Sequence, residues 1–452
     1  MCAQGVDSVK VTELRSREDA LFARLHPRSA ETAQRADRVM PNGVPMAWFV
    51  TSYDHPPLWV AEGRGSRFRD IDGNEYVDFN IADMSMFTGY APELVVKAVA
   101  NRMAAGSQFL LPIEDAIWVA EELRRRYGMP QWQFTLSASG ANVEAIRVAR
   151  ANTGRDKILF FSGKYHGHFD EALLELDNGE LVTEEAGLPS NVGENVVMVH
   201  FNDLEGLGSA LERHEIAVVV TEPVLTNWVG LVLPDPDFHA QLRAMTRDTG
   251  TLLTLDETHT HVVGIGGLTS LWSLEPDIIT IGKSIGGGMP FGAYGMTEEV
   301  AEPLRRPTKP DSVLPGVATG GTLFANPLSI AAARATLGEI LVPEAYQRTQ
   351  ALGTLLANGI EATITRAGLP WIANRFWPRS GYTFGPTMPR NAAEAWKVLD
   401  APLRDLMRIY LANRGVWEAI VGAGPTCSVA TEANDVDDYL SAFDALIGEI
   451  TA

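Results

Sequence analysis

Short apolar segments that alternate with helical patterns are the feature that most limits what this chain can fold into. Most of these segments, in the middle of the 452-residue sequence, are apolar at nearly every position rather than at every second one. Such strands are buried on both faces, as in a mostly parallel sheet covered by helices, and ligands bind beyond their carboxyl ends. The pattern predicts an α/β fold. The predicted strands are Trp132–Leu136, Lys157–Phe161, Val196–His200, Ala217–Thr221, Thr251–Leu255 and Ile278–Ile281.

The last predicted strand leads into the stretch TIGKSIGGGMPFGAYG, from Thr280 to Gly295. This stretch puts Lys283 at a strand end, in a loop with three consecutive glycines. Burial disfavours the charged form of a lysine, and a neutral amine is a nucleophile. We therefore expect Lys283 to carry an aldehyde cofactor as a Schiff base. A Walker phosphate loop is excluded, because the position five residues before Gly282 is Asp277 and not glycine.

Other residues suited to a cofactor also follow predicted strands. Asp256 ends a buried run, where a carboxylate needs a partner such as a protonated pyridine nitrogen; a helix cap or a salt bridge would serve as well. Tyr165, next to His166, could stack on a planar ligand or simply complete the edge of the core. Glu222 and Asn227 lie just past another strand, in what could also be an ordinary polar loop.

Two turns suit a phosphate group. The first, around Ala138 and Ser139, leads from a strand into a helix, whose free N–H groups and dipole favour anions. The second, around Thr322, precedes another helix. Either could be an ordinary capped helix or glycine turn. Together, two phosphate contacts, a stacking ring, a carboxylate and a lysine are what pyridoxal phosphate (PLP) requires.

Two His-x-His pairs leave a metal site open as an alternative. They are His166 with His168 and His259 with His261. No carboxylate or cysteine spacing completes a known type of site, so no metal is predicted.

Composition argues against several kinds of partner. The net charge of −20 disfavours nucleic acids and anionic membranes. No apolar run reaches the roughly 18 residues of a membrane span, and the N-terminus lacks the apolar core of a signal peptide. The two cysteines, Cys2 and Cys427, suit a reducing cytoplasm.

The flanking regions show helical patterns, turn residues and a few strand patterns. Asp72-Gly73-Asn74 predicts a hairpin between strands at 66–71 and 75–79. Helices are predicted over 1 to about 40, 92–126, 328–341 and 344–367, and further strands over Ser380–Phe384, Val416–Ile420 and Thr426–Ala430. We expect an N-terminal segment (1–60), a large domain (61–334) and a smaller domain (335–452).

The chain resembles the class III aminotransferases of PLP fold type I, in the branch that contains glutamate-1-semialdehyde aminomutase and the β-amino-acid aminotransferases. The resemblance extends from about Ala30 to Tyr439 and rests on the lysine stretch together with YHGH, EPVLTN, LDE and GGTLFANPLS. It implies a mostly parallel central sheet in a large domain. It also implies a smaller α+β domain built from the C-terminal and part of the N-terminal segment, and a homodimer.

The resemblance also implies a role for each matching residue. Lys283 would bind the cofactor and move a proton between substrate and cofactor carbons, while Asp256 would pair with the pyridinium nitrogen. Tyr165 would stack on the ring, and Asn227 would hydrogen-bond the phenolic oxygen. Further cofactor contacts are implied for Ala138, Ser139, His166, Glu222, Thr258 and, from the neighbouring subunit, Thr322.

The sequence departs from the family pattern in the phosphate turn and at the substrate end. Gly140 replaces the acidic residue of the usual SGTEA turn, and the arginines that hold substrate carboxylates align with Met46 and Ala423. Arg379 is the nearest replacement candidate. The residues expected at the substrate end are Trp48, Phe49, Asp83, Phe87 and Trp228. Aromatic faces and a carboxylate suit an apolar or cationic amine, unless the tryptophans only fill a dimer interface.

Three functions compete. The first is an aminotransferase that moves an amino group from an amine or amino acid to a keto acid or ketone through a pyridoxamine form of PLP. The alternative is an aminomutase of the glutamate-1-semialdehyde type, or a racemase, on the same scaffold. A non-enzymatic PLP-binding or metal-binding protein is disfavoured by the presence of both Lys283 and Asp256.

Overall fold

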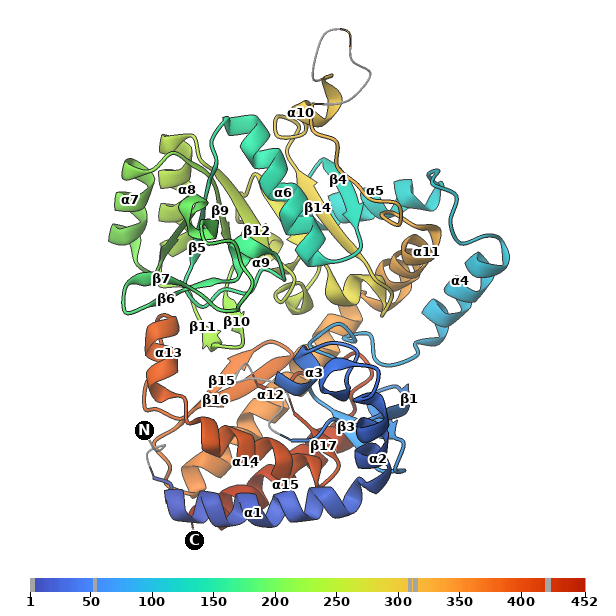
Figure 1. Cartoon of the computed structure of the whole chain (residues 1–452), viewed down its shortest axis with the longest axis vertical. Coiled ribbons are helices and arrows are strands. Elements are labelled where there is room, and N and C mark those ends of the chain that lie inside the picture. Colours follow the sequence, from blue (N-terminus) through green and yellow to red (C-terminus); the bar gives the residue numbers. More distant parts are fainter. Residues whose placement is uncertain (1–4, 52–54, 308–310, 312–315, 419–423, 452) are drawn as a thin grey trace.

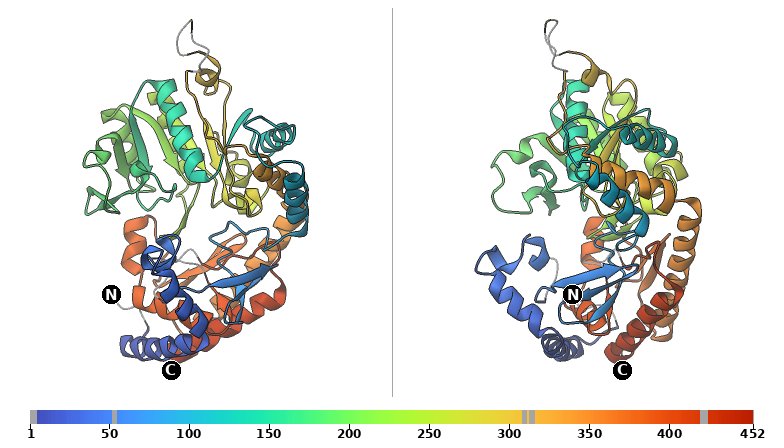
Figure 2. Two further views of the ribbon diagram at one scale, coloured as in Figure 1. Left: turned by 45° about the vertical axis from the view of Figure 1, so that its right-hand side comes forward. Right: turned by 90° about the vertical axis from the view of Figure 1, so that its right-hand side faces the viewer.

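The chain forms two lobes (Figure 1). The computed structural model describes residues 5–51, 55–307, 311, 316–418 and 424–451. One lobe contains a seven-stranded sheet and its helices. The other brings the N-terminal helix α1 (Ser8–Leu25) beside the C-terminal helices α14 (Ala401–Ala412) and α15 (Ala433–Thr451). The same two lobes are visible from two further sides in Figure 2.

The large sheet confirms the predicted α/β fold. All six predicted strands are present, each within one residue of the predicted bounds. Neighbours β12–β13, β9–β12, β5–β9 and β5–β8 pair in parallel, whereas β14 is antiparallel to both of its neighbours. Across the sheet, the strands are β4 (Gln131–Thr135), β14 (Gly292–Met296), β13 (Ile278–Ile281), β12 (Leu252–Asp256), β9 (Ile216–Thr221), β5 (Lys157–Phe161) and β8 (Val196–Val199).

The seventh strand, β14, was not predicted because two of its five residues are glycines. Both positions lie too close to a neighbouring group for a side chain. A Cβ on Gly292 would stand 2.2 Å from the carbonyl oxygen of Ser137, and one on Gly295 would stand 2.6 Å from the ring of Trp132. Close backbone approach therefore places glycine where strand propensity alone argues against it.

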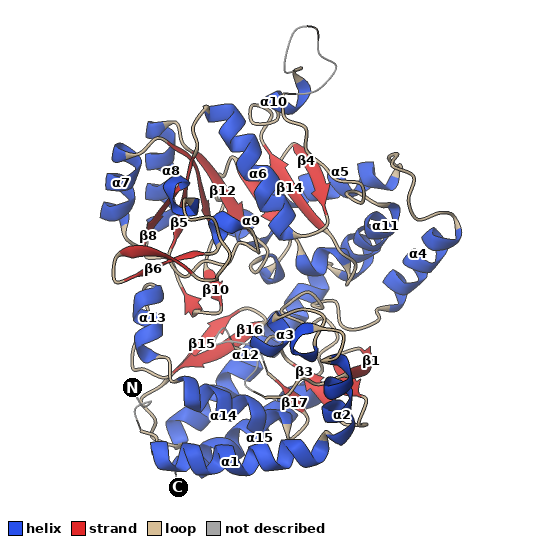
Figure 3. Ribbon diagram, viewed as in Figure 1, coloured by secondary structure: helices blue, strands red, loops and turns tan. Residues whose placement is uncertain are grey.

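Helices cover both faces of the sheet, as Figure 3 shows. Alternate residues of β5 point to opposite sides: Ile158 and Phe160 pack under α6, while Leu159 and Phe161 pack under α7 and α8. This explains the near-continuous apolar strands, because neither face is exposed to water. The helices of this lobe are α4 (Glu93–Ala104), α5 (Asp115–Tyr127), α6 (Ala138–Thr153), α7 (Leu204–Arg213), α8 (Phe238–Thr249), α9 (Gly267–Leu271), α10 (Glu302–Arg305) and α11 (Pro327–Ala335).

The second lobe is built around one hydrophobic core that joins distant parts of the chain. Val11, Val77, Leu356, Leu406 and Phe443 all belong to it. The predicted hairpin is present as an antiparallel pair, within a four-stranded sheet of order β1–β2–β3–β17. The remaining elements of this second lobe are α2 (Pro27–Ala36), α3 (Trp48–Thr51), α12 (Pro343–Arg366), α13 (Ala392–Val398), β1 (Val60–Arg64), β2 (Arg67–Asp70), β3 (Glu75–Asp78), β15 (Ile372–Phe376), β16 (Arg379–Thr383) and β17 (Val416–Trp417). The division of the chain into an N-terminal segment, a large domain and a smaller domain, with boundaries after residues 60 and 334, stays a prediction.

One local prediction was wrong. The segment 426–430 forms only an isolated antiparallel bridge, between Thr426 and Arg379, and then turns, because the Ser428 amide donates to the Thr431 hydroxyl and the Ala430 amide to the Ser428 hydroxyl. The helix predicted over 328–341 is confirmed: α11 is followed directly by a π-helical turn over Thr336–Ile340. The strand predicted over 416–420 is present at its start, as β17 over Val416–Trp417. Residues 419 and 420 lie outside the described ranges.

Two small hairpins complete the large lobe, β6 (Leu174–Asp177) with β7 (Glu180–Thr183) and β10 (Leu225–Asn227) with β11 (Gly230–Val232). None of the helices in the described ranges combines the length and hydropathy of a membrane-spanning segment.

Candidate active site

Lys283 lies where β13 ends, at the start of a short 3₁₀ turn over Lys283–Gly286. Its backbone is left-handed, with φ of 52°. The preceding residue must be small, since a Cβ on Gly282 would stand 2.9 Å from both the amide nitrogen and the Cβ of Ala138. This contact holds the lysine against the first turn of α6. The apolar strand and the glycine therefore place Lys283 beside the predicted phosphate turn.

The Lys283 amine is held by Asp83. Its Nζ donates to Asp83 Oδ2 at 2.5 Å and to the Asp83 carbonyl oxygen at 2.9 Å. Burial alone would raise the pKa of the Asp83 carboxyl, but the Lys283 ammonium, together with His259 and Arg379, outweighs burial and holds that pKa well below its usual range. Asp83, predicted at the substrate end, thus contacts the reactive amine directly.

Asp83 sits on a backbone turn of unusual conformation. Four consecutive non-glycine residues, Ile81 to Met84, have positive φ values of 45°, 49°, 52° and 66°. Each such residue costs about 1–2 kcal/mol relative to an ordinary helical conformation. The Asp78 carboxylate holds the turn by accepting from the amides of Asn80 and Ile81, both at 2.8 Å. Strain of this kind clusters at functional sites.

Asp256 is fully enclosed and surrounded by donors. Its Oδ2 is 2.9 Å from His166 Nδ1 and 2.8 Å from Asn142 Nδ2, and its Oδ1 accepts from the Thr258 amide at 3.0 Å. Burial alone would raise the pKa of Asp256, but these partners, His166 foremost, lower it to about 2. The carboxylate is therefore ionised at neutral pH and available to a cation in the adjoining cavity.

Glu222 organises the loop that follows β9. Its Oε1 accepts from Asn227 Nδ2 at 2.6 Å and from the Tyr165 amide at 3.2 Å. Its Oε2 is 2.9 Å from His259 Nδ1. The centroid of the Tyr165 ring is 5.4 Å from that of Trp48 and 6.2 Å from that of His259. The predicted aromatic and polar residues of this region thus form one cluster.

The predicted phosphate turn is packed as closely as the lysine loop. Ser137 caps α6 by accepting from the Gly140 amide at 3.1 Å. Ser139 Oγ accepts from the His168 amide at 3.2 Å, and a Cβ on Gly167 would stand only 2.0 Å from that oxygen. A cavity of about 350 Å³ opens here, lined among others by Ala138, Ser139, Tyr165, His166, Asp256, Thr258 and Lys283.

A larger cavity of about 640 Å³ is lined in part by Asp83. Its walls are mainly apolar and aromatic. Three carboxylates, Glu62, Asp78 and Asp83, also line it, whereas its described lining includes no lysine or arginine. The aromatic lining residues are Trp48, Phe49, Trp59, Phe68, Tyr90 and Trp417. Met46 lies in the same wall, whereas Ala423 is outside the described residues.

Several predicted residues lie away from these cavities. Phe87 is completely buried in the core, with its ring 6.1 Å from that of Tyr346, so it presents no surface to a substrate. Trp228 stacks on Trp396 of α13 at 5.4 Å. Thr322 is exposed, and its carbonyl oxygen accepts from Gln108.

Arg379 is buried beside the Asp83 turn. Its Nη1 donates to the Thr226 carbonyl at 2.6 Å, while its Nε has no hydrogen-bond partner among the described residues. Burial lowers the pKa of Arg379 to about 10, so it remains charged at neutral pH. Arg379 is not among the described residues that line either the cavity at Lys283 or the larger cavity at Asp83.

The four histidines considered for a metal have separate partners. His166 contacts Asp256, His259 contacts Glu222, and His261 Nε2 accepts from the Ser284 hydroxyl at 2.5 Å. His168 is exposed near Glu185. Within the described ranges, no three His, Cys, Asp or Glu side chains come together as a metal site.

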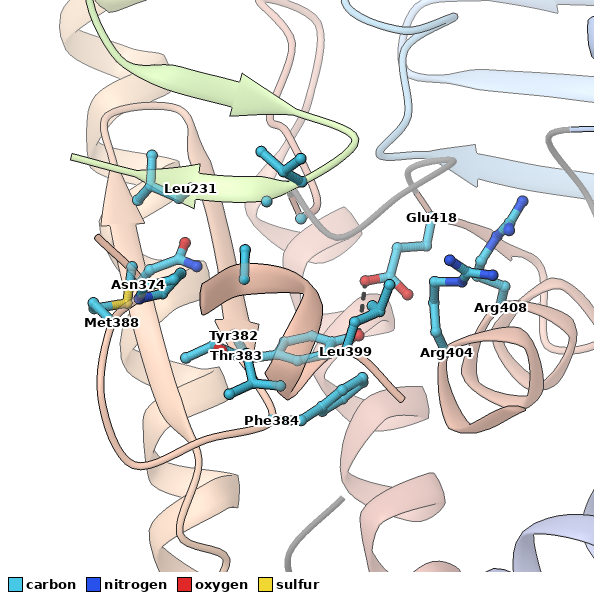
Figure 4. Close-up of a pocket in the computed structure, with 16 residues that line it drawn as sticks. Leu231, Asn374, Tyr382, Thr383, Phe384, Met388, Leu399, Arg404, Arg408 and Glu418 are labelled. Atoms are coloured by element: carbon cyan, nitrogen blue, oxygen red, sulfur yellow. Dashed lines mark hydrogen bonds between the residues drawn. The ribbon is translucent and has the colours of Figure 1, made fainter. Parts of the chain in front are cut away.

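A smaller cavity lies between the β10–β11 hairpin and the second lobe (Figure 4). Its volume is about 70 Å³, well below the roughly 300 Å³ of a typical small-molecule site. Glu418 lines it and accepts from the Tyr382 hydroxyl at 3.1 Å, while burial raises the pKa of Glu418 to about 6. A cofactor the size of PLP is excluded here.

Three features of the site escaped sequence analysis. Asn142, which bonds Asp256, reads in the sequence as an ordinary helix residue. His259 was considered only as a metal ligand. The pairing of Asp83 with Lys283 joins residues 200 positions apart, through a turn that carries no glycine signal.

The family model described as Aminotransferase class-III matches residues 49–368. The chain belongs to this family. The match confirms the predicted resemblance and fold, and PLP as the cofactor. The protein is thus an enzyme of a PLP-dependent class, and the site residues fit the cofactor: a buried ionised carboxylate, an aromatic ring and a lysine line one cavity of adequate size.

Individual relatives share most of the chain. A glutamate-1-semialdehyde 2,1-aminomutase from Desulfitobacterium hafniense (strain Y51) is 36% identical over 76% of this chain and 80% of its own. The structure of a glutamate-1-semialdehyde aminomutase from Pseudomonas aeruginosa PAO1 in complex with PMP has 36% identity and a TM-score of 0.94, covering 99% of this chain and 100% of that one. An omega-transaminase from Sphaerobacter thermophilus is 31% identical with a TM-score of 0.86, covering 94% and 98%.

Proposed function

We propose that this protein binds PLP through Lys283 and relocates an amino group within a single substrate molecule, as an aminomutase. The observation that carries the proposal is the juxtaposition of Lys283, ionised Asp256 and Tyr165 around one cavity. Its similarity to glutamate-1-semialdehyde aminomutases in sequence and in structure supports this reaction over the aminotransferase that we first predicted.

In this proposal each residue has a physical task. Bound PLP supplies an electron sink for the carbon that carries the amino group. Lys283 accepts and returns the proton at that carbon, since its side chain lines the same cavity as Asp256 and Tyr165. Asp256 holds a proton on the ring nitrogen, and Tyr165 covers the ring. Further contacts are proposed for Ala138, Ser139, His166, Glu222, Asn227 and Thr258.

A second candidate is an aminotransferase for apolar or cationic amines. The observation that favours it is the large cavity beside Asp83, whose described lining combines aromatic rings with three carboxylates and lacks cationic side chains. Aromatic faces and carboxylates attract cations and repel a carboxylate-bearing substrate. Trp48 and Asp83 are the proposed contacts here. Arg379 is proposed to hold a substrate carboxylate if the aminomutase reaction is the correct one.

The two candidates differ in what one substrate does alone. An aminotransferase given only an amine donor converts its cofactor to the amine form and stalls, whereas an aminomutase turns over without a keto acceptor. We propose measuring cofactor absorbance and product in single-substrate mixtures, with amino aldehydes, which carry both the amino group and the carbonyl that receives it, cationic amines and β-amino acids as parallel panels. Turnover without an acceptor supports the aminomutase; a stall that an acceptor relieves supports the aminotransferase. Inversion without migration identifies a racemase.

The proposal includes a cytoplasmic homodimer. Apolar side chains are exposed on and after α4, among them Met103, Phe109, Leu110 and Leu111. Exposed apolar groups gathered in one region favour association with another protein surface. Thr322 lies in the same region, bonded to Gln108, which supports a contact with the partner's phosphate site.

A further inference from the structure

The turn at Asp83 presents two oxygen atoms to one ammonium group. Lys283 Nζ donates to Asp83 Oδ2 at 2.5 Å and to the Asp83 carbonyl oxygen at 2.9 Å. Carboxylate and carbonyl oxygens only accept hydrogen bonds, and an ammonium group only donates them. The lysine therefore shows where the chain holds an alkylammonium ion, and by which two atoms.

The surrounding backbone fixes this pair of oxygens. The left-handed turn begins at Ile81, which is 2% exposed and whose amide donates to Asp78 at 2.8 Å. It ends at Met84, which is 0% exposed and whose sulfur accepts from Arg379 Nη1 at 3.1 Å. Because both ends of the turn are buried and bonded, the oxygens of Asp83 stay in place when the lysine moves away.

The same turn belongs to both cavities of the site. Asp83 lines the larger cavity, whereas Ser85, two residues later, lines the cofactor cavity together with Lys283. The Asp83 side chain is 35% exposed, so an ion in the larger cavity can reach its carboxylate. An amine in the larger cavity can therefore contact Asp83 while it lies next to Lys283.

Formation of a Schiff base empties the ammonium site at least in part. The Lys283 ammonium carries three hydrogens, whereas an imine nitrogen carries one at most, so Lys283 can no longer donate to both oxygens of Asp83. His259 and Arg379 also lower the pKa of the Asp83 carboxyl, which favours its charged form after the lysine ammonium has gone. A new cationic donor is then the matching partner.

We propose that Asp83 is a substrate-binding residue whose carboxylate and carbonyl oxygens hold the ammonium group of the incoming amine beside the Schiff base on Lys283. This inference rests on the proposed function and applies to both candidate reactions. Alkyl amines enter as ammonium ions at neutral pH, as the lysine side chain itself does. Asp83 thus holds whichever of the two amines is not bonded to PLP.

The position of this ammonium site also selects a class of substrate. In an α-amino acid the carboxylate is attached to the carbon that carries the ammonium group, so it would lie beside the Asp83 carboxylate and be repelled. The described lining of the larger cavity offers no lysine or arginine to offset this repulsion. The substrate is therefore an amine, or an amino aldehyde, whose amine-bearing carbon carries no carboxylate.

The first test measures binding of protonated N,N-dimethylbenzylamine, a tertiary amine that cannot form a Schiff base. Calorimetry on the PLP-loaded enzyme should give a dissociation constant about tenfold larger in Asp83→Asn than in the wild type. Asp37→Asn is the matched control and should leave the constant unchanged, because Asp37 is an exposed carboxylate outside both cavities.

The second test uses the cofactor-free enzyme, in which Lys283 itself occupies the site. Lys283→Ala releases Asp83, so the same cation should bind about tenfold tighter than to the cofactor-free wild type. Combining Lys283→Ala with Asp83→Asn should remove this gain. A merely structural role of Asp83 would not make cation binding depend on the lysine.

The third test compares 2-phenylethylamine with phenylalanine, which differ by one carboxylate. The rate at which each changes the absorbance of the loaded cofactor should favour the amine at least tenfold in the wild type. In Asp83→Asn this preference should fall, because the repulsion of the carboxylate is lost. A preference that is equal in both enzymes contradicts the proposed selection.

Equal dissociation constants of the cation in loaded wild type and Asp83→Asn overturn the inference and leave the proposed function intact. If Asp83→Asn does not fold, the comparison of Lys283→Ala with the wild type decides, and equal binding to these two cofactor-free enzymes contradicts the inference. A wild type that shows no Schiff-base absorbance with PLP overturns the proposed function instead. The two failures are therefore distinguishable.

Discussion

The ion pair between Asp83 and Lys283 predicts that removal of the acid strengthens cofactor binding. Lys283 must release Asp83 and lose its proton before its amine can bond to an aldehyde. Asparagine has nearly the shape of aspartate without its charge. In Asp83→Asn we therefore expect PLP to bind more tightly and to react faster with the lysine.

The size of the effect follows from the exposure of the pair. The two charged atoms are 2.5 Å apart, and the side chains are 15% exposed for Lys283 and 35% for Asp83. Pairs at the surface contribute about 0.2–1 kcal/mol, whereas breaking buried pairs costs about 3–5 kcal/mol. Because solvent screens Asp83 in part, we expect about 1–2 kcal/mol, a roughly 5- to 30-fold fall in the PLP dissociation constant.

The assay is a titration of the cofactor-free enzyme with PLP, followed by Schiff-base absorbance at constant pH and ionic strength. Glu62→Gln is the matched control, because Glu62 lines the same large cavity and is exposed, without contact to Lys283. An equal or larger dissociation constant in Asp83→Asn, with the melting temperature unchanged, would refute the reasoning.

Three further predictions concern the cofactor cavity and the oligomer. Asp256→Asn removes a carboxylate whose pKa is lowered from 3.8 to about 2. In urea unfolding, the variant should lose about 2 kcal/mol of the free energy of unfolding at pH 7; this loss should be complete above pH ~4 and should fade as the pH falls towards 2. A loss of the same size at every pH would contradict this prediction. Gly167 has a φ of 103°, and an added Cβ would stand 2.0 Å from the Ser139 hydroxyl oxygen, so Gly167→Ala should weaken PLP binding at least tenfold. Gly179→Ala, at φ of 86° with open space around it, should not. Leu110→Glu, at a position 73% exposed, should convert a dimer to monomers in light scattering, whereas Val39→Glu, at 81%, should not; a monomeric wild type would sink the dimer proposal.

Much of the fold was predictable because burial on both faces leaves a continuous apolar signal in each parallel strand. β9 is buried at all six of its positions, and its strand was predicted to within one residue. Prediction failed where side-chain hydrogen bonds or close packing override propensity. The turn at Ser428, held by local side-chain hydrogen bonds, and the glycine-containing β14, whose close neighbours Ser137 and Trp132 are distant in the sequence, are two such cases.

The site was predictable to the extent that its residues end neighbouring strands. Asp256 ends β12 and Lys283 comes just after β13, and these strands pair in parallel, so topology alone brings the two residues to one edge. The remaining contacts come from elsewhere in the chain. Asp83 reaches the lysine through a left-handed turn of ordinary residues, and His259 gains its orientation from Glu222, 37 positions away.

The account depends most directly on Lys283 as the residue that bonds PLP. The enzyme is incubated with PLP, and borohydride then reduces the Schiff base to a stable bond. Peptide mass spectrometry locates the lysine that carries the cofactor. We expect the modification on Lys283 in the wild type, and neither modification at that peptide nor Schiff-base absorbance in Lys283→Ala. Modification of another lysine, such as the buried Lys164, with Lys283 unmodified would contradict the account.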